Sequence, residues 1–179
     1  MSDPELQSVT PVENIAGPSA GQSPARAQQC PCPGAVLAGE PERLEHLVQE
    51  ALLARRIGYL DAFLLAFDQD ARYDSPNFLW FRSRYPRFVY VDRIAVAASA
   101  RGRGCARRLY HDLFEHTRRA GHARIVCEVN STPANPESDA FHAALEFVEV
   151  GAASIHDGNK TVRYLPHALA ASAAVSTPR

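Results

Sequence analysis

The spacing of apolar and polar residues predicts alternating helices and strands between about residues 39 and 168. Residues 40–56 predict a surface helix with one buried stripe, formed by Leu44, Leu47, Val48 and Leu52. The apolar run "YLDAFLLAF" (59–67) has the length of a strand, and "RFVYVDRIAVA" (87–97) is rich in residues typical of a buried strand. Residues 68–86 combine turn residues with aromatics and predict a long loop.

The alternation continues in the second half of this region. Apolar residues recur at helical spacing from Gly104 to Gly121, a natural helix stop; they are Ala106, Leu109, Tyr110, Leu113, Phe114 and Thr117. "ARIVCEVN" (123–130) predicts a strand, and Asn135 caps a predicted helix. The inward face of that helix is predicted to contain Ala140, Phe141, Ala144 and Leu145. "FVEVGA" (147–152) and "NKTVRYLP" (159–166) predict closing strands, so the fold class is mixed α/β.

The two ends of the chain have a different composition. Residues 1–38 are rich in Pro, Ser, Gln, Gly and Ala without periodicity, which predicts a disordered or atypical N-terminal segment. Within the N-terminal region, only "PGAVLAGE" (33–40) offers a weak candidate for a first strand. Residues 169–179 predict a flexible tail, which leaves one domain at 39–168.

Charge and cysteine content exclude several function classes. The formal net charge of -1 provides no general field for nucleic acid or an anionic membrane. No stretch has the roughly 20 apolar residues of a membrane span, and the N-terminus lacks a basic and then apolar leader, so the expected location is the cytoplasm. Cys30 and Cys32 lack a second pair at ligand spacing, and no metal site is predicted. Cys105 and Cys127 are expected to be buried thiols.

A glycine-rich stretch, "RGRGCA" (101–106), lies between a predicted strand and a predicted helix. Backbone N–H groups at a helix N-terminus attract anions, and glycines let phosphate oxygens approach the backbone. The alternative is a solvated turn. A nucleotide P-loop is disfavoured because the Gly-Lys-Ser/Thr ending is missing, and the Gly-x-Gly-x-x-Gly spacing of a dinucleotide site is absent.

These residues resemble a known family signature. Arg101, Gly102, Arg103, Gly104, Cys105 and Ala106 are similar to the Arg/Gln-x-x-Gly-x-Gly/Ala signature of the GCN5-related N-acetyltransferase (GNAT) superfamily, and "NPESDAFHAALEF" (135–147) resembles its second signature. The segment from residue 73 to residue 151 is also similar to a group of bacterial predicted GNAT acetyltransferases without an assigned substrate. The resemblance covers residues 59–166 and implies a GNAT fold, with a mixed, mostly antiparallel sheet, flanking helices and splayed central strands.

The resemblance also implies a coenzyme site for acetyl-CoA. The pyrophosphate would bind the backbone N–H groups between Arg101 and Ala106. The pantetheine arm would pair with the backbone of three strand residues, Ile94, Ala95 and Val96. Asn135 and Ser138 would contact the coenzyme arm, although Asn135 is equally explained as a helix cap.

Three residues are candidates for catalysis. Asp92 interrupts an apolar strand where many family members carry a glutamate, so it is either a base or a structural carboxylate paired with a neighbouring arginine. Glu128 shares a strand face with Asn130 and is either a second base candidate or a wall residue. His142 stands where family members often have the tyrosine that protonates the thiolate, and the alternative is a surface histidine without a role.

Two further features concern the acceptor and the second signature. Aromatic and polar residues of the 68–86 loop form either an acceptor-site wall or a lid packed on the core; they are Tyr73, Asp74, Asn77, Trp80 and Tyr85. Glu146 stands where the family usually has Gly, which predicts a strained or differently built turn at the helix end.

The sequence therefore predicts an enzyme, an N-acetyltransferase that moves an acetyl group from acetyl-CoA directly to an amine of a small molecule or peptide. The acceptor is not identified, and both a monomer and a homodimer remain open. The main alternative is a non-catalytic acyl-CoA-binding module, which would keep the 101–106 turn but would not depend on Asp92, Glu128 or His142. RNA binding would require a wider basic face than the sequence offers.

Overall fold

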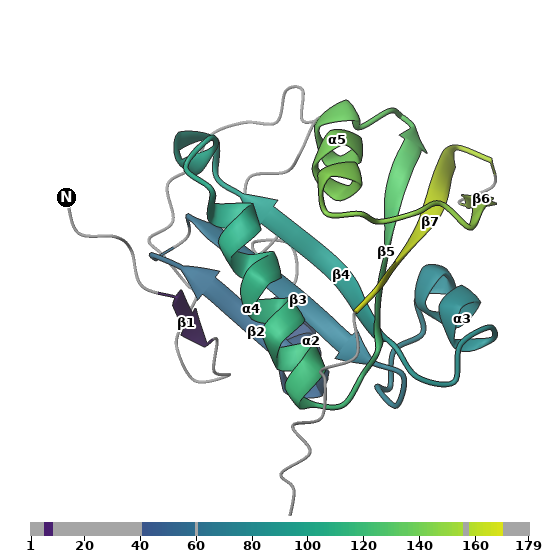
Figure 1. Cartoon of the computed structure of the whole chain (residues 1–179), viewed down its shortest axis with the longest axis horizontal. Coiled ribbons are helices and arrows are strands. Elements are labelled where there is room, and N and C mark those ends of the chain that lie inside the picture. The colour runs from purple at the N-terminus through teal and green to yellow at the C-terminus, as the bar shows by residue number, and fades with distance from the viewer. Residues whose placement is uncertain (1–5, 9–40, 60, 156–157, 170–179) are drawn as a thin grey trace, which may run out of the picture. The chain divides into compact units, whose positions relative to one another are not determined.

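The structure, a computed structural model, describes residues 6–8, 41–59, 61–155 and 158–169 (Figure 1). Contacts divide the chain into two compact units, the first made of residues 1–72 and 92–113 and the second of residues 73–91 and 114–179. Each unit is described separately below. Most of the N-terminal segment 1–38 and residues 170–179 of the expected tail lie outside the described residues, so both remain predictions.

Seven strands form a mixed, mostly antiparallel sheet among the described residues, in the order β1-β2-β3-β4-β5-β7-β6. The strands are β1 (Leu6–Ser8), β2 (Leu53–Ile57), β3 (Ala62–Asp68), β4 (Val89–Val96), β5 (Arg124–Thr132), β6 (Gly151–Ile155) and β7 (Lys160–Ala168). β4 contributes residues to both units. Its pairing with β5 is parallel, and the pairs are Val89 with Ile125 and Tyr90 with Val126. The α/β fold class predicted from the sequence is confirmed.

In the first unit, α2 (Pro41–Glu50) lies beside the antiparallel hairpin of β2 and β3. Leu44 of α2 packs with Phe63 of β3, and Val48 and Ala95 contact this pair, so the predicted apolar stripe is confirmed for these α2 positions. The helix is shorter than predicted, because Leu53–Ile57 forms β2 and pairs with β3 from Leu53 opposite Ala66 to Ile57 opposite Ala62. Strand pairing thus overrides the helical spacing of the apolar residues.

A first strand is present where the sequence did not indicate one. β1 pairs antiparallel with β2, with Leu6 opposite Ile57 and Ser8 opposite Arg55. The candidate at residues 33–40 lies outside the described residues. Three residues carry too little periodicity to predict a strand from the sequence, so the partner strand β2 determines β1.

The predicted long loop contains a helix, α3 (Pro76–Arg82), which corrects the interpretation of residues 68–86. Pro76 lies in the first turn, and Asn77, Phe78 and Phe81 are buried. The Ser75-Pro76 step and the spacing of Phe78 and Phe81 are signals of a short helix that the loop interpretation missed. Burial of the phenylalanines makes α3 part of the core of the second unit.

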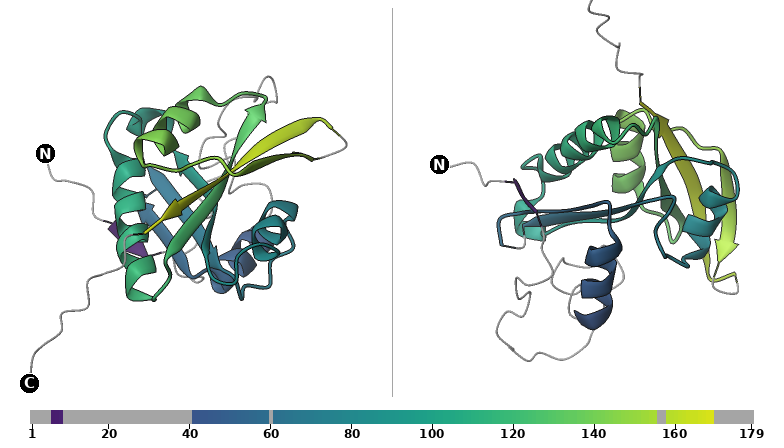
Figure 2. Two further views of the ribbon diagram at one scale, coloured as in Figure 1. Left: turned by 45° about the vertical axis from the view of Figure 1, so that its right-hand side comes forward. Right: turned by 90° about the horizontal axis from the view of Figure 1, so that it is seen from below.

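The second unit places helices on both sides of β5 and β7. Glu128, Val126 and their partners Tyr164 and Pro166 point to one face of this pair, and α3 covers that face, since Trp80 and Phe81 contact the Tyr164 ring. α5 (Pro136–Ala144) packs on the opposite face through Asp139, which pairs with Arg163. Figure 2 shows α3 and α5 on opposite sides of the two strands.

The helix predicted from Gly104 to Gly121 is confirmed as α4 (Cys105–Arg119). Leu109, Tyr110 and Leu113 are fully buried, as their spacing predicts. Gly121 has φ 74, and its N–H donates to the Arg118 carbonyl, so a glycine ends the helix. A short 3-10 turn, η1 (Ala98–Ala100), connects β4 to the stretch before α4.

Two predictions in the C-terminal half are wrong in detail. The inward face of α5 is not the one predicted, because Ala140 and Ala144 are exposed whereas His142 is buried. The sixth strand begins at Gly151 and not at Phe147, although the N–H groups of Val148 and Val150 donate to carbonyls of β7 residues. Both errors arise because burial and strand pairing depend on contacts between elements, which the spacing of residues within one element does not reveal.

Candidate active site

The 101–106 turn directly precedes and enters α4 in the first unit. Gly102 has φ 73 and Gly104 has φ 76, both in the left-handed region that favours glycine. A Cβ built at either glycine would meet nothing within 4 Å, so the turn offers open space at both positions. Residues 101–104 are exposed, whereas Cys105 is buried and anchors the start of the helix.

The N–H groups of this turn are available for a ligand. In the part of the chain that the structure describes, the first N–H after Arg101 to bond a carbonyl is that of Arg108, which donates to Gly104 at 3.0 Å. Among the described residues, the N–H groups of residues 102–107 therefore have no backbone acceptor within hydrogen-bond geometry, and the positive end of the α4 dipole lies at the same place. This arrangement favours an anion such as phosphate.

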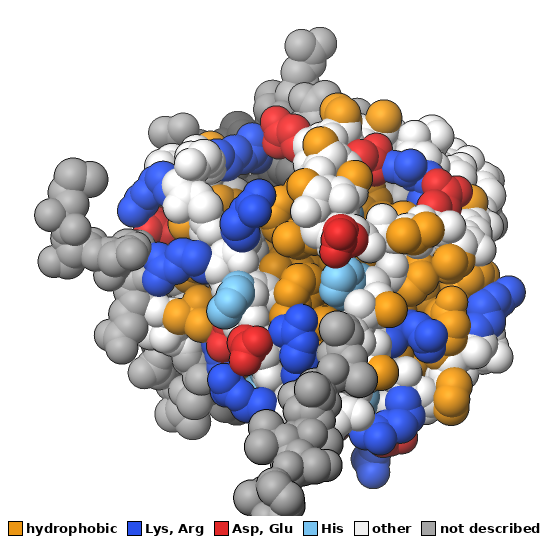
Figure 3. Space-filling model, in the orientation of Figure 1, with side chains coloured by type: hydrophobic (Ala, Val, Ile, Leu, Met, Phe, Trp, Pro, Cys, Tyr) orange, Lys and Arg blue, Asp and Glu red, His pale blue; other side chains and the backbone are white. Residues whose placement is uncertain are grey.

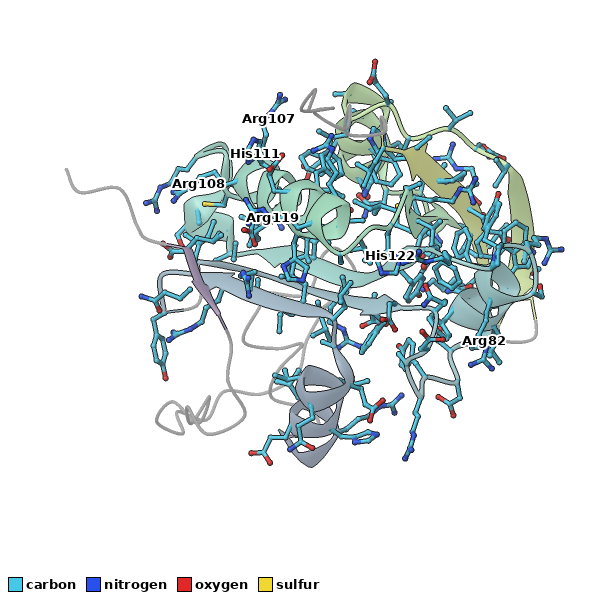
Figure 4. All side chains as sticks on the ribbon, turned by 60° about the horizontal axis from the view of Figure 1, so that its bottom comes forward. Arg82, Arg107, Arg108, His111, Arg119 and His122 are labelled. Carbon is cyan, nitrogen blue, oxygen red and sulfur yellow. The ribbon has the colours of Figure 1, made fainter. Side chains whose placement is uncertain are left out.

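Basic side chains surround the start of α4, where Figure 3 shows several of them. Arg103 is half exposed and lies 3.7 Å from the Asp61 carboxylate. Arg101 and Arg107 are exposed and have no ion-pair partner among the described residues. Figure 4 shows Arg107 and His111 projecting outward from α4. The positive charge is concentrated at the start of α4, whereas the formal net charge of the whole chain is -1.

The predicted pantetheine strand is the C-terminal part of β4. Ile94, Ala95 and Val96 are half-buried, and the Ala95 side chain packs against the Leu44 cluster of the first unit. The ladder between β4 and β5 includes only Val89 and Tyr90 of β4 in the described ranges. Ile94, Ala95 and Val96 therefore take no part in that ladder.

Asp92, also on β4, pairs with the guanidinium of the adjacent Arg93. Only 6% of its side chain is exposed. The ion pair agrees with the interpretation of Asp92 as a structural carboxylate, which the sequence left open beside a role as base.

Glu128 is half-buried on β5, directly opposite Tyr164 of β7. Side chains of directly opposed residues share a face of the sheet, so Glu128 and Tyr164 are neighbours. Burial raises the pKa of Tyr164, the negative charge of Glu128 raises it further, and Arg84 acts in the opposite direction. The Tyr164 hydroxyl is therefore protonated through neutral pH.

Residues of α3 and Arg84, which follows it, lie around Tyr164 of β7, and together they form what we call the α3 cluster: Asn77, Trp80, Phe81, Arg84 and Tyr164. The Tyr164 hydroxyl donates to Asn77 Oδ1 at 3.2 Å, and both residues are buried. The Trp80 ring stacks on Tyr164 with centroids 3.9 Å apart, and the Arg84 guanidinium lies 3.8 Å from the Trp80 ring centroid. The sequence analysis missed Tyr164, because only the strand register places it opposite Glu128, and it missed Arg84, because the loop interpretation hid the helical spacing that brings Arg84 to Trp80.

The other predicted wall residues mainly support packing. Tyr73 contacts the rings of Phe78 and Tyr90, and Tyr85 lies under the guanidinium of Arg124, whereas Asp74 is exposed. These contacts agree with a lid packed on the core of the second unit.

His142 is buried on α5, with its ring against Phe141 and Phe147. Its Nδ1 lies 2.7 Å from the Ser138 carbonyl, so Nδ1 carries a hydrogen that it donates. Burial lowers the pKa of His142, and the bond to Ser138 and the charge of Asp139 oppose this effect only in part. The ring is therefore neutral at neutral pH, and the alternative of a surface histidine is wrong.

Asn135 and Ser138 form the N-terminal cap of α5. Asn135 Oδ1 accepts the N–H of Ser138 at 3.2 Å, which confirms the predicted cap. At the other end of the helix, Glu146 adopts φ 61, so the turn where the family usually has Gly is built by a glutamate in the left-handed region.

Comparison with known proteins shows which family has the sequence features of this chain. The sequence model described as "Acetyltransferase (GNAT) family" matches residues 44–147, more than half of the chain. The chain belongs to the GNAT acetyltransferase family. This membership agrees with the resemblance carried by the 101–106 turn and the 135–147 segment.

A curated relative of this GNAT protein is the L-2,4-diaminobutyric acid acetyltransferase of Wolinella succinogenes. The two are 30% identical over 80 residues, which cover 44% of this chain. The match spans only 46% of the relative, less than half of its length.

Solved GNAT structures share the fold. The IAA acetyltransferase from Bacillus cereus is 12% identical with a TM-score of 0.59, and 92% of this chain and 99% of that chain are covered. The ribosomal-protein-S18-alanine N-acetyltransferase from Escherichia coli is 15% identical with a TM-score of 0.53, covering 76% and 81%. Arabidopsis thaliana NAA60, solved with acetyl-CoA, is 16% identical with a TM-score of 0.56, covering 73% and 84%.

The described residues contain neither a membrane-spanning helix nor a cluster of metal-ligating side chains. None of their helices is long and apolar enough to cross a membrane. Among the same residues, no group of three or more His, Cys, Asp or Glu side chains is arranged to hold a metal ion.

Proposed function

We propose that this GNAT protein is an N-acetyltransferase that uses acetyl-CoA and transfers the acetyl group directly to an amine acceptor. The domain that does so would comprise residues 39–168. The acceptor class proposed is a primary amine of a small molecule or a peptide. The name of the Wolinella relative, an acetyltransferase of an amino acid with a second amine, supports this class.

The 101–106 turn is the observation that carries the proposal. Six N–H groups that have no backbone acceptor among the described residues, two glycines with open space and exposed arginines suit the phosphates of coenzyme A. The backbone of Ile94, Ala95 and Val96 outside the β5 ladder supports its use by the pantetheine arm. Bound acetyl-CoA would supply the acetyl group as a thioester.

We assign proton removal from the amine to Glu128. The reactive amine must be neutral, so a carboxylate that accepts its proton promotes attack. Asp92 is better explained as a structural carboxylate, because Arg93 holds it. Cys105 and Cys127 are buried, and Cys127 points to the strand face opposite Glu128, which supports direct transfer without an acetylated cysteine.

His142 remains the candidate acid for the departing thiolate, and this role predicts a pH dependence of turnover. Because burial lowers the pKa of His142, its cationic form predominates only at a more acidic pH than for an ordinary histidine. An acid role of the imidazolium therefore requires turnover to fall as pH rises through the pKa of His142. Turnover without this decline would leave His142 as a packing residue of α5.

Isothermal titration of acetyl-CoA into wild type, Arg103→Glu and Arg119→Glu tests the coenzyme site. We expect wild type to bind with a Kd on the order of micromolar. Arg103→Glu should weaken binding about 10- to 100-fold, because it reverses a charge beside the anion site. Arg119→Glu makes the same charge change at an exposed position at the C-terminal end of α4 and should have little effect. Absence of binding to wild type would refute the coenzyme assignment.

Thiol release on a panel of amines then tests the chemistry. Glu128→Gln should lower kcat/KM about 10²- to 10⁴-fold while the Kd of acetyl-CoA stays the same. Coenzyme binding without turnover on any amine would favour the non-catalytic acyl-CoA-binding module. Full activity of Glu128→Gln would refute the assignment of the base.

A further inference from the structure

The face of the β5 and β7 pair that carries Glu128 is covered by α3, whose Asn77 is the buried partner of the Tyr164 hydroxyl. Asn77 lies at the start of α3, and 87 residues separate it from Tyr164. A buried hydroxyl requires a partner, and here the acceptor is supplied by a helix that covers the face of the proposed base. The contact satisfies the buried hydroxyl, and it also sets the direction of the Tyr164 O–H bond beside Glu128.

The Tyr164 ring has little freedom to move. Trp80 stacks on one side with an interplanar angle of 19°, and Phe81 contacts the ring edge-on at 5.2 Å. Trp80 itself fits against Gly151, where a Cβ would lie 3.1 Å from the indole. The position of the Tyr164 hydroxyl is therefore fixed, and only the direction of its O–H bond remains to be determined.

We propose that Asn77 is a positioning residue for acetyl transfer, which accepts the Tyr164 hydroxyl proton and so keeps that hydroxyl from donating to the Glu128 carboxylate. The inference rests on the proposed function, in which Glu128 is the base. A hydrogen bond donated to a carboxylate stabilises its charged form and makes it a weaker base. Asn77 thus preserves the ability of Glu128 to take a proton from the amine.

The groups around Tyr164 determine whether a change in the pKa of Glu128 can be attributed to the Tyr164 hydroxyl. On β7, the neighbours of Tyr164 on the same face are Val162 and Pro166, which do not titrate. Just after α3, Arg84 is the positively charged group that acts on Tyr164. On the paired part of β4, Tyr90 lies opposite Val126. Tyr164 stays protonated because burial and Glu128 raise its pKa, so it remains a donor over the whole range of the test.

The decisive variants are Asn77→Leu, Tyr164→Phe and the double variant. Asn77→Leu keeps the branched shape of the side chain and removes the acceptor. The Tyr164 hydroxyl then turns to Glu128, whose side chain can rotate about three torsions to meet it. The pKa of Glu128 should then fall by about one pH unit, the size expected for one hydrogen bond to a charged group. Tyr164→Phe alone should leave it unchanged, and adding Tyr164→Phe to Asn77→Leu should restore it.

The measurement is a carbon-13 NMR titration of protein labelled at the glutamate carboxyl carbons, with the Glu128 resonance assigned through Glu128→Gln. The acidic limb of the pH profile of kcat/KM should shift by the same amount as the Glu128 pKa measured by NMR. A purely structural role of Asn77 would not be rescued by Tyr164→Phe. If Asn77→Leu does not fold, Asn77→Ala in the same two backgrounds makes the same comparison.

Two results would overturn the inference. One is an unchanged Glu128 pKa in the folded Asn77 variant. The other is a pKa that rises in Tyr164→Phe alone, which would mean that the hydroxyl already donates to Glu128 in wild type. The NMR result does not depend on turnover, so failure of Glu128 as the base, seen as full activity of Glu128→Gln, is distinguishable from failure of this inference.

Discussion

The 101–106 turn takes its features from six consecutive residues, whereas the α3 cluster joins α3 to a strand 87 residues further along the chain. The turn is exposed, and its glycines have open space around them. The α3 cluster is mostly buried and tightly packed, with Trp80 between Arg84 and Tyr164 and against Gly151.

Because of this difference, substitutions in the two regions should affect different properties, namely ligand binding and stability. A turn made of exposed backbone contributes little burial, so changes there should affect ligand binding more than the free energy of unfolding. A cluster of stacked rings removes much apolar area from water, so changes there should affect stability first. The following predictions test whether the two regions are separable in this way.

Trp80→Ala should have the largest effect on stability. It removes the ring that stacks on Tyr164 and leaves a gap beside Gly151. We expect a loss of about 2–3 kcal/mol, somewhat below the cost of a fully buried Trp because Trp80 is half-buried. The Tm should fall by about 5–10 °C in calorimetry, with the Kd of acetyl-CoA unchanged.

Leu79→Ala is the matched control for Trp80→Ala on the same helix. Leu79 is 38% exposed, so its truncation should change the unfolding free energy by no more than about 0.5 kcal/mol. An equal loss in both variants, or a large loss of acetyl-CoA affinity in Trp80→Ala, would contradict the separation of the two regions.

Gly104→Ala should show the reverse pattern. The added Cβ occupies space that the phosphates would need, so the Kd of acetyl-CoA should rise about tenfold, or 1.4 kcal/mol. The free energy of unfolding should fall by about 1 kcal/mol, the cost of a positive φ at a residue other than glycine.

Gly158→Ala separates these two effects. Gly158 has φ 86 and its nearest outside atom is 4.0 Å from a built Cβ, but it follows β6 in the second unit. The same stability loss is expected with no change in acetyl-CoA affinity, as measured by calorimetric titration. A similar loss of affinity in both variants would show that the turn has no special role in binding.

Glu146→Gly should have the smallest effect and the opposite sign. Glu146 has φ 61, so glycine would relieve the left-handed strain at the end of α5. Greater freedom of the unfolded chain offsets part of the gain, which leaves about 0.5–1 kcal/mol of stabilisation. Thermal unfolding measures it against Glu137→Gly, which lies in the first turn of α5 and should destabilise by a similar amount. A variant no more stable than wild type would mean that the turn carries no strain.

Local features were well predicted by the sequence. The N-cap of α5, the glycine that ends α4 and the glycine-rich turn before α4 each depend on a few adjacent residues. Features that depend on pairing or packing between elements were not. The apolar spacing that predicted a longer first helix belongs in part to β2, because β3 offers it a hairpin. The burial of His142 likewise follows from packing against Phe147 and not from the period of α5.

The sequence by itself determined the mixed α/β class, most of the elements and the turn that suits an anion, because helix periods, caps and positive-φ glycines are properties of neighbouring residues. Only the tertiary structure decided which residues surround Glu128. The register of β5 and β7 places Tyr164 opposite it, and the packing of α3 brings Asn77 to the Tyr164 hydroxyl. Such contacts depend on strand pairing and burial between segments far apart in the chain, and no local pattern encodes them.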